Sequence, residues 1–292
     1  MIDRIETIHG SVVQHGRHND RIYLMHLHGT DHEGLIATLD RMAVEHGYGK
    51  IFAKIPAADW HAFQAAGYIQ EALVPGFFNG QTDGLFVAKY FSEDRQRRSR
   101  RPGFDPMRRR GRRPEPPAVS SLKINVCTPA DSDAMAAVYG QVFESYAFPI
   151  HQPEFIRHMM KDKAVYFCAR IKKKMAALAA AEIDDIHQCC EMTDFATLPE
   201  YRRMGLAVRL LNRLEDEALK RGVKTAYTIA RVDSYGMNRV FVKLGYRYAG
   251  CLINNTQIGG RIRSMYVRYK RLKRPPCLIS RPGTIKSALE AG

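Results

Sequence analysis

The sequence lacks the features that mark several classes of protein. Its six cysteines include no C-x-x-C pair, so neither a zinc site nor a disulfide framework is indicated, and a reducing compartment is expected. No stretch approaches the roughly 20 apolar residues of a membrane span, and the N-terminus has no basic segment followed by an apolar one. We therefore expect a cytoplasmic protein with no metal and no membrane partner.

Acidic residues are fewer than basic ones, and the imbalance is concentrated in one segment. The formal net charge is +15, and residues 92–118 hold ten arginines and five prolines against four acidic residues. This composition cannot bury a core, which predicts a disordered linker at 92–119 between a region at 1–91 and a domain at 120–273, with a tail at 274–292. Because the charge is not spread over a folded face, nucleic acid is not the expected partner. The alternative is an arm that recruits RNA, a membrane surface or a protein.

Strand-like and helix-like runs alternate after the linker. Residues 164–171 and 175–184 are apolar runs joined by a basic turn, which predicts a hairpin. The longer run 189–198 leads into a helix that starts after Gly205 and stops at Gly222, a suitable C-cap. This alternation predicts an α/β domain.

The junction between that strand and that helix has the composition of an anion site. It reads YRRMGLAVRLL, residues 201–211, and a helix that starts after a glycine turn presents unpaired N–H groups to one spot. Small side chains at Gly205 and Ala207 would let a pyrophosphate approach the backbone, and Arg202 or Arg203 would add charge-assisted bonds. The alternative is an ordinary turn glycine at a solvated helix start.

The segment RRMGLA matches the Q/R-x-x-G-x-G/A signature at Arg202, Gly205 and Ala207, and residues 120–272 resemble the GNAT superfamily of N-acetyltransferases. The resemblance implies a mixed α+β fold with a strongly twisted sheet flanked by helices, and acetyl-CoA as co-substrate. It also implies a set of coenzyme A contacts: the backbone of Phe195, Ala196 and Thr197, the loop residues Arg202, Arg203, Met204, Gly205, Leu206 and Ala207, and Asn238.

Acetyl transfer to an amine requires a group that accepts a proton, because a lysine-type amine has a pKa near ~10.4. Glu191 is the candidate, since the resemblance places a glutamate base on the strand that carries the cofactor and a carboxylate inside a strand needs a reason. Asp194 is a candidate substrate contact. By strand alternation it faces the other side, unless a β-bulge intervenes.

The leaving thiolate must gain a proton, and here the sequence departs from the family. Phe241 stands where many GNAT enzymes have a tyrosine, so that acid is missing. Tyr235 is the first candidate to replace it. Ser234, Tyr246 or water are the alternatives.

Three longer stretches narrow the resemblance. EMTDFATLPEYRRMGLA, SYGMNRVFVKLGY and INNTQIGGRIRSMYVRYKRL are similar to the β-lysine N-acetyltransferase family. This implies direct acetylation of the side-chain amine of β-lysine in a ternary complex, giving the compatible solute Nε-acetyl-β-lysine, with a lysine 2,3-aminomutase as functional neighbour. A substrate with two ammonium groups favours acidic partners. The candidate partners are Glu182, Asp184, Glu191 and Asp194. Tyr146 and Phe148, in the loop ESYAFPIHQPEF, are predicted walls of the substrate site.

The N-terminal region contains an internal repeat. Residues 34–55 parallel 205–229, and 65–91 parallel 243–270, so this region resembles the second half of a GNAT fold, beginning with the strand RIYLMHL. The counterpart of RRMGLA is DHEGLI, whose two acidic residues would repel a pyrophosphate. We expect no coenzyme A there, but a packing or homodimerising role or a wall of the substrate pocket.

Two rival functions remain at this level. One is a GNAT enzyme that acts on a protein or RNA amine recruited by the arginine-rich segment. The other is a non-catalytic protein that binds acyl-CoA or nucleic acid, which the phenylalanine at position 241 allows.

Overall fold

The computed structural model describes residues 3–97 and 121–273. The N-terminal half contains β1 (Arg4–Ile8), β2 (Ser11–Gly16), β3 (Arg21–His26), α1 (His32–His46), β4 (Lys50–Pro56), α2 (Trp60–Ala65), β5 (Ile69–Phe78), β6 (Thr82–Tyr90) and α3 (Glu93–Gln96). The C-terminal half contains β7 (Leu122–Val126), α4 (Ser132–Val142), α5 (Pro153–Asp162), β8 (Ala164–Ile171), β9 (Lys174–Asp184), β10 (Cys189–Thr197), α6 (Leu206–Lys220), β11 (Thr225–Arg231), α7 (Tyr235–Lys243), β12 (Arg247–Ile258) and β13 (Arg261–Arg271). Among the described helices, none is long and apolar enough to cross a membrane.

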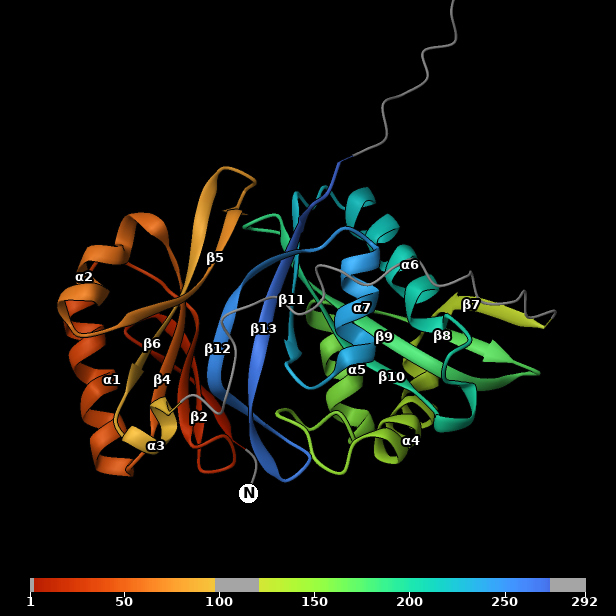
Figure 1. The fold of residues 1–292 in the computed structure, drawn as a ribbon, viewed down its shortest axis with the longest axis horizontal. Coiled ribbons are helices and arrows are strands. Elements are labelled where there is room, and N and C mark those ends of the chain that lie inside the picture. Colours follow the sequence, from red (N-terminus) through yellow and green to blue (C-terminus); the bar gives the residue numbers. More distant parts are fainter. Residues whose placement is uncertain (1–2, 98–120, 274–292) are drawn as a thin grey trace, which may run out of the picture.

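All the described strands join one 13-stranded sheet (Figure 1). Its order is β1-β2-β3-β4-β6-β5-β12-β13-β11-β10-β9-β8-β7. Apart from the edge strand β7, the strands of the two halves follow the same order from the edges of the sheet to its middle, where β5 and β12 meet. Each half has one parallel pair, β3 with β4 and β10 with β11. A helix makes each parallel crossover, α1 in one half and α6 in the other, as parallel strands require.

The repeat is longer than the similarity of the residues suggests. Strands β1 and β2 occupy the places of β8 and β9. The structural similarity between the two halves therefore begins at Arg4 and not, as predicted, at the strand RIYLMHL. These two strands have little sequence similarity to their counterparts, because a strand constrains the pattern of burial more than the identity of its residues. The C-terminal half adds β7, α4 and α5 to the shared elements.

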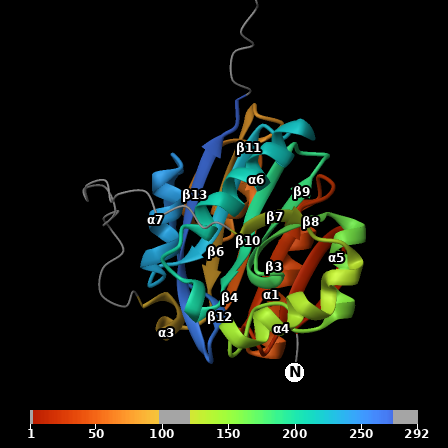
Figure 2. The same ribbon diagram turned by 90° about the vertical axis from the view of Figure 1, so that its right-hand side faces the viewer.

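The two halves meet at β5 and β12 and share a core. Gly250 pairs with Ala72 across the junction, and Phe52, Phe77 and Phe86 pack in one cluster with Tyr227, Leu252 and Val267. The regions predicted at 1–91 and 120–273 are therefore parts of one continuous sheet. In the N-terminal half, helices α1 and α2 cover the face of the sheet that points away from this shared cluster. In the C-terminal half, α6 and α7 cover one face of the sheet and α4 and α5 cover the other (Figures 1 and 2).

The predicted linker starts too early. Residues 93–96 form the short helix α3, and Arg95 is buried, with Nη1 2.8 Å from Asp20 Oδ2 and Nε donating to Asn254 O at 2.7 Å. This arginine is a structural link between the halves rather than part of a solvated arm. The rest of the predicted linker and the tail at 274–292 lie outside the described residues.

Candidate active site

A bulge in β10 decides which side chains face the site. The register between β10 and β9 shifts between Thr193 and Ala196, and Asp194 has a φ of 54°. The extra residue reverses the alternation after Thr193. Glu191 and Asp194, which regular alternation would place on opposite faces, therefore line the same cavity.

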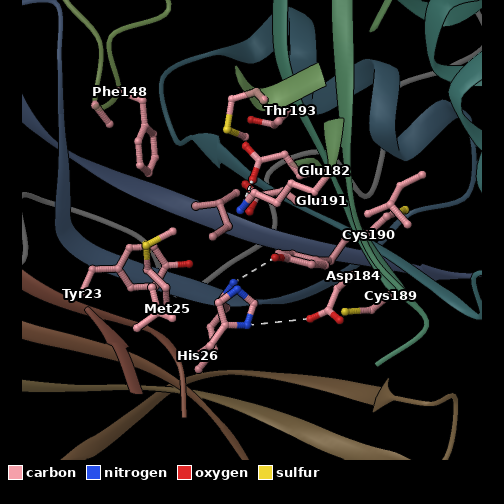
Figure 3. Close-up of a pocket in the computed structure, with 18 of the residues that line it drawn as sticks. Tyr23, Met25, His26, Phe148, Glu182, Asp184, Cys189, Cys190, Glu191 and Thr193 are labelled. Atoms are coloured by element: carbon pink, nitrogen blue, oxygen red, sulfur yellow. Dashed lines mark hydrogen bonds and ion pairs between the residues drawn. The ribbon is translucent and has the colours of Figure 1, made fainter. Parts of the chain in front are cut away.

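The cavity has a volume of about 620 Å³ and lies between the two halves (Figure 3). The N-terminal half contributes Tyr23, His26 and Lys54 from β3 and β4. The C-terminal half contributes Glu182, Glu191 and Asp194 from β9 and β10. A cavity of this size suits a small molecule rather than a polymer. The N-terminal half is thus a wall of the pocket, one of the roles predicted for it.

The environments of Glu191 and Asp194 keep both carboxyl groups partly protonated near neutral pH. Burial, with the neighbouring charge of Glu182, raises the pKa of Glu191 to about 7. Burial and the same neighbour raise the pKa of Asp194 to about 7. Asp194 is held by a hydrogen bond from Thr193 Oγ1 at 3.2 Å and another from the hydroxyl of Tyr146. A carboxyl group whose pKa lies near the working pH is suited to proton transfer.

Glu191 is linked to the N-terminal half through a tyrosine. The Tyr227 hydroxyl hydrogen-bonds to Glu191, and Lys54 Nζ donates to Tyr227 Oη at 3.1 Å. The nearby Lys54 charge and the Tyr227 bond both lower the pKa of Glu191, so they limit the rise that burial causes. Neither Lys54 nor Tyr227 was predicted from the sequence. The available signal for Lys54 was a lysine inside the apolar run IFAKI, which needs a reason as Glu191 does.

The structure places Tyr146 and Phe148, the two predicted walls of the substrate site, at the same cavity. Tyr146 and Phe148 line the cavity, and their loop is fixed by the N-terminal half, because His18 Nε2 lies 2.9 Å from Tyr146 O. Glu182 also lines the cavity, but its carboxylate pairs with Lys163 Nζ at 3.1 Å. The predicted loop is shorter than its sequence suggests, because its last residues begin helix α5 at Pro153.

Asp184 lies in a cluster with His26 and His187 at the cavity wall (Figure 3). Its Oδ2 lies 2.8 Å from His187 Nδ1 and 3.9 Å from His26 Nδ1. Burial and the nearby Lys54 lower the pKa of His26 to about 4. The three side chains offer ligand atoms within 4.8 Å of one another, but the positive charge that suppresses protonation of His26 also opposes a metal cation, and we assign none.

The predicted cofactor loop leaves the start of helix α6 without a side-chain cap. Gly205 is the N-cap of α6 with a φ of 73°, no side chain caps the helix, and no acidic residue lies in its first turn. Arg202 and Arg203 are exposed beside it. Strands β10 and β11 pair at Cys189–Glu191 and Thr225–Tyr227 but not beyond, so the backbone of residues 195–197 has no β11 partner. That open edge is where an extended pantetheine arm would pair.

Helix α1, the counterpart of α6, is already capped. Asp31 Oδ1 accepts a hydrogen bond from Gly34 N at 2.9 Å, and Glu33 adds a negative charge to the first turn. The site that α6 leaves open is therefore filled in α1 by a carboxylate. This supports the expectation that the N-terminal half binds no coenzyme A.

Two predicted residues do not have the surroundings that their roles require. Asn238 is buried, and its Nδ2 donates to Arg231 O and Ser234 O at 2.9 and 3.0 Å. Its side chain holds the start of α7 against β11, and a cofactor contact by Asn238 stays a prediction. Tyr235 is 65% exposed and does not line the cavity, because it begins α7 at the surface. Phe241 is in the core, edge-on to Phe195.

Comparison with known proteins identifies the family. The model of the acetyltransferase (GNAT) family matches residues 133–246. Beta-lysine N(6)-acetyltransferase of Methanococcus maripaludis is 33% identical over 273 residues, which cover 92% of this chain and 99% of that protein. The enzyme of the same name from Methanosarcina mazei is 36% identical over 138 residues, covering 47% of this chain and 51% of that protein.

A solved acetyltransferase from Salmonella typhimurium, with its cofactor acetyl-CoA, has a TM-score of 0.45 and 15% identity, covering 54% of this chain and 97% of that one. The family is established by the Methanococcus relative, which matches nearly the whole of both chains. The chain belongs to the GNAT family of acetyl-CoA-dependent N-acetyltransferases, in the group that includes beta-lysine N(6)-acetyltransferase.

Proposed function

We propose that this protein acetylates the side-chain amine of β-lysine by direct transfer in a ternary complex. The observation that carries the proposal is the pair Glu191 and Asp194. The bulge brings both into one cavity beside the open edge of β10, with pKa values near 7. The names of the two archaeal relatives support the substrate, and the acidic lining suits a molecule with two amines.

Glu191 is the proposed base. The amine arrives as an ammonium ion, and the ionised Glu191 carboxylate removes its proton so that the nitrogen lone pair is free to attack. Acetyl-CoA would supply the thioester carbonyl: its carbon forms the new C–N bond, its C–S bond breaks, and the nitrogen loses its second proton to solvent. Tyr227 orients Glu191 through its hydroxyl. Because Tyr235 does not line the cavity, we propose that solvent protonates the thiolate, which is a fair leaving group.

Residues of the α6 loop are proposed to hold the cofactor. The amides of residues 203–207 are free of side-chain caps and would bind the pyrophosphate, while Arg202 and Arg203 would supply positive charge. The physiological setting rests on the family resemblance: a cytoplasmic enzyme that makes a compatible solute from the product of a lysine 2,3-aminomutase. Homodimer formation stays a prediction.

The test is the release of free coenzyme A from acetyl-CoA by the purified protein with four acceptors compared: β-lysine, lysine, ornithine and a basic peptide. The proposal expects the highest kcat/KM with β-lysine and a product acetylated at the side-chain nitrogen, identified by NMR. Turnover with the peptide alone would overturn it and favour an enzyme that acts on proteins.

A further inference from the structure

The charges that line the cavity are divided between the two halves of the chain. Carboxylates come from β9 and β10, where Glu191 and Asp194 face the proposed acceptor amine. Arg21 and Lys54 come from β3 and β4 of the N-terminal half and face them, while the C-terminal half adds Lys163, which pairs with Glu182 of that half. A substrate with an amine at one end and a carboxylate at the other would match this division.

Lys54 has no carboxylate partner among the described residues. Its Nζ donates to Tyr227 Oη and lies 5.4 and 5.6 Å from the ring centroids of Tyr23 and Tyr227. Two aromatic faces and a phenol stabilise an ammonium ion without neutralising it. Against the effect of burial, Tyr23 and Glu191 hold the pKa of Lys54 above its usual value, and Lys54 is linked to Glu191 only through the Tyr227 hydroxyl. Because Glu191 takes up a proton in the proposed reaction, a second anionic group in the cavity would be favoured beside Lys54.

The other cationic groups of the cavity have partners or are neutral. Lys163 is paired with Glu182. Arg21 is buried between the halves, where its Nη1 donates to Asn255 O at 2.7 Å and to Thr256 Oγ1 at 2.9 Å. Its Nε is buried with no hydrogen-bond partner among the described residues and remains available as a second donor. His26 is neutral at physiological pH because its pKa is about 4.

We propose that Lys54 binds the carboxylate of the substrate, so that the N-terminal half selects amino acids over simple diamines. The inference rests on the proposed function and extends it to the opposite end of the substrate. Lys54 and Glu191 are bridged by the Tyr227 hydroxyl, so the proposed carboxylate site and the proposed proton-accepting site lie in one cavity. The degenerate repeat thus supplies specificity in place of cofactor binding.

The test compares β-lysine with 1,4-diaminopentane, which is β-lysine without its carboxylate. Wild-type protein is expected to prefer β-lysine. Measured at about pH 9, where Glu191 is ionised in either protein, Lys54→Met should lower the ratio of kcat/KM for β-lysine to that for the diamine by about 100-fold, because the variant lacks a charged hydrogen bond that the diamine never forms. Lys54→Arg should restore part of the loss. Lys89→Met is the matched control, since Lys89 is a half-buried lysine of the same sheet that pairs with Asp40 and does not line the cavity.

Three outcomes would overturn the inference. One is an unchanged preference in Lys54→Met protein that melts like wild type. Another is an equal loss with both amines, accompanied by a shift in the pH profile, which would mean that Lys54 acts on the protonation of Glu191. The third is wild-type protein that acetylates the diamine as well as β-lysine. Wild-type protein that acetylates neither compound would instead overturn the proposed function, and the inference with it.

Discussion

At the scale of single residues, the site depends on carboxyl groups that the fold keeps from ionising freely. Glu191 is half-buried in the cavity wall, with two other carboxylates as neighbours. Burial disfavours the charged form more than Lys54 and Tyr227 favour it, which places the pKa of Glu191 near 7 instead of 4.5. Such a group can accept a proton at neutral pH and still release it to water.

Glu191→Gln tests this role. We expect kcat/KM for the amine to fall by about 100-fold or more, which is the usual contribution of a general base. In wild-type protein, log kcat/KM should rise with pH through about 7 as Glu191 ionises. That inflection should be absent from the variant. A variant that keeps the inflection near pH 7 would assign the ionisation to another group, with Asp194 as the first to examine.

Asp194→Asn tests the cost of burying the second carboxyl group. The pKa of Asp194 is 3.8 ordinarily and about 7 in the folded protein, so the folded state binds this proton more tightly than the unfolded state does. The free energy of unfolding therefore falls as pH rises between these values. The variant avoids this cost, so its Tm relative to wild type should be higher at pH 8 than at pH 5, by on the order of 5 °C.

The control for that measurement is Glu200→Gln. Glu200 is exposed, and its pKa is lowered by hydrogen bonds, the largest from its own backbone and the next from Lys174. Its removal should not raise the Tm at pH 8. If Asp194→Asn shows no gain in Tm at pH 8 relative to pH 5, Asp194 is not a strained carboxylate in the folded protein.

At the scale of elements, helix α6 combines a structural and a functional glycine. Gly205 precedes its first residue with a φ of 73°, and Gly222 follows its end with a φ of 80° and no atom within 4 Å of the position that a Cβ would take. Both positions strain an L-residue, but only Gly205 lies at the proposed pyrophosphate site. Comparing substitutions at Gly205 and Gly222 therefore separates the effect of backbone strain on stability from the effect on acetyl-CoA binding.

Gly205→Ala and Gly222→Ala should each lower the free energy of unfolding by about 1 kcal/mol. Gly205→Ala alone should raise the KM for acetyl-CoA, by about tenfold, because a strained turn misplaces the amides that would bind the phosphates. Chemical denaturation and steady-state kinetics measure the two effects. Equal KM values in both variants would argue against a pyrophosphate at this helix start.

Helices α6 and α5 show why some elements could be predicted from the sequence and others could not. Helix α6 spans Leu206–Lys220, close to the predicted limits, because its apolar stripe and flanking glycines are local signals. The predicted loop at 144–155 includes the first three residues of helix α5, although Pro153 at its first position is a typical helix start. Its apolar residues pack under the loop that carries Tyr146, a contact that no local pattern specifies.

At the scale of the whole molecule, the junction of the two repeats forms the pocket. Gly250 approaches β5 so closely that a Cβ there would lie 2.1 Å from Glu71 O. Next to it, Lys50 Nζ pairs with Glu71 at 2.7 Å and donates to Ile253 O at 2.8 Å. A change that separates β5 from β12 would therefore disturb both the shared core and the cavity.

Gly250→Ala should lower the free energy of unfolding by about 3 kcal/mol, since the added methyl group meets the backbone of β5. It should also reduce acetyl transfer, because Lys54 and Glu191 come from opposite sides of the junction. Gly260→Ala is the control, as Gly260 also has a positive φ, 70°, but no atom within 4 Å of its Cβ position. Thermal unfolding of the two variants is the measurement. Equal Tm values would show that β5 and β12 move apart to accept the methyl group at little cost.

The sequence by itself determined the family of the protein and marked a candidate cofactor loop. Strand, glycine turn and helix are encoded within about 20 residues, so RRMGLA and its surroundings could be interpreted locally. Glu191 was found for a similar reason, since a carboxylate inside a strand-like run is conspicuous in any context.

The tertiary structure alone decided how the site is assembled. The bulge that turns Asp194 towards Glu191 places a non-glycine residue at a φ of 54°, which only the surrounding strands can stabilise. Lys54 reaches Tyr227 across 173 positions of sequence, because the two repeats meet edge to edge in one sheet. Contacts over such separations depend on how elements pack, and packing is a property of the folded chain rather than of any short segment.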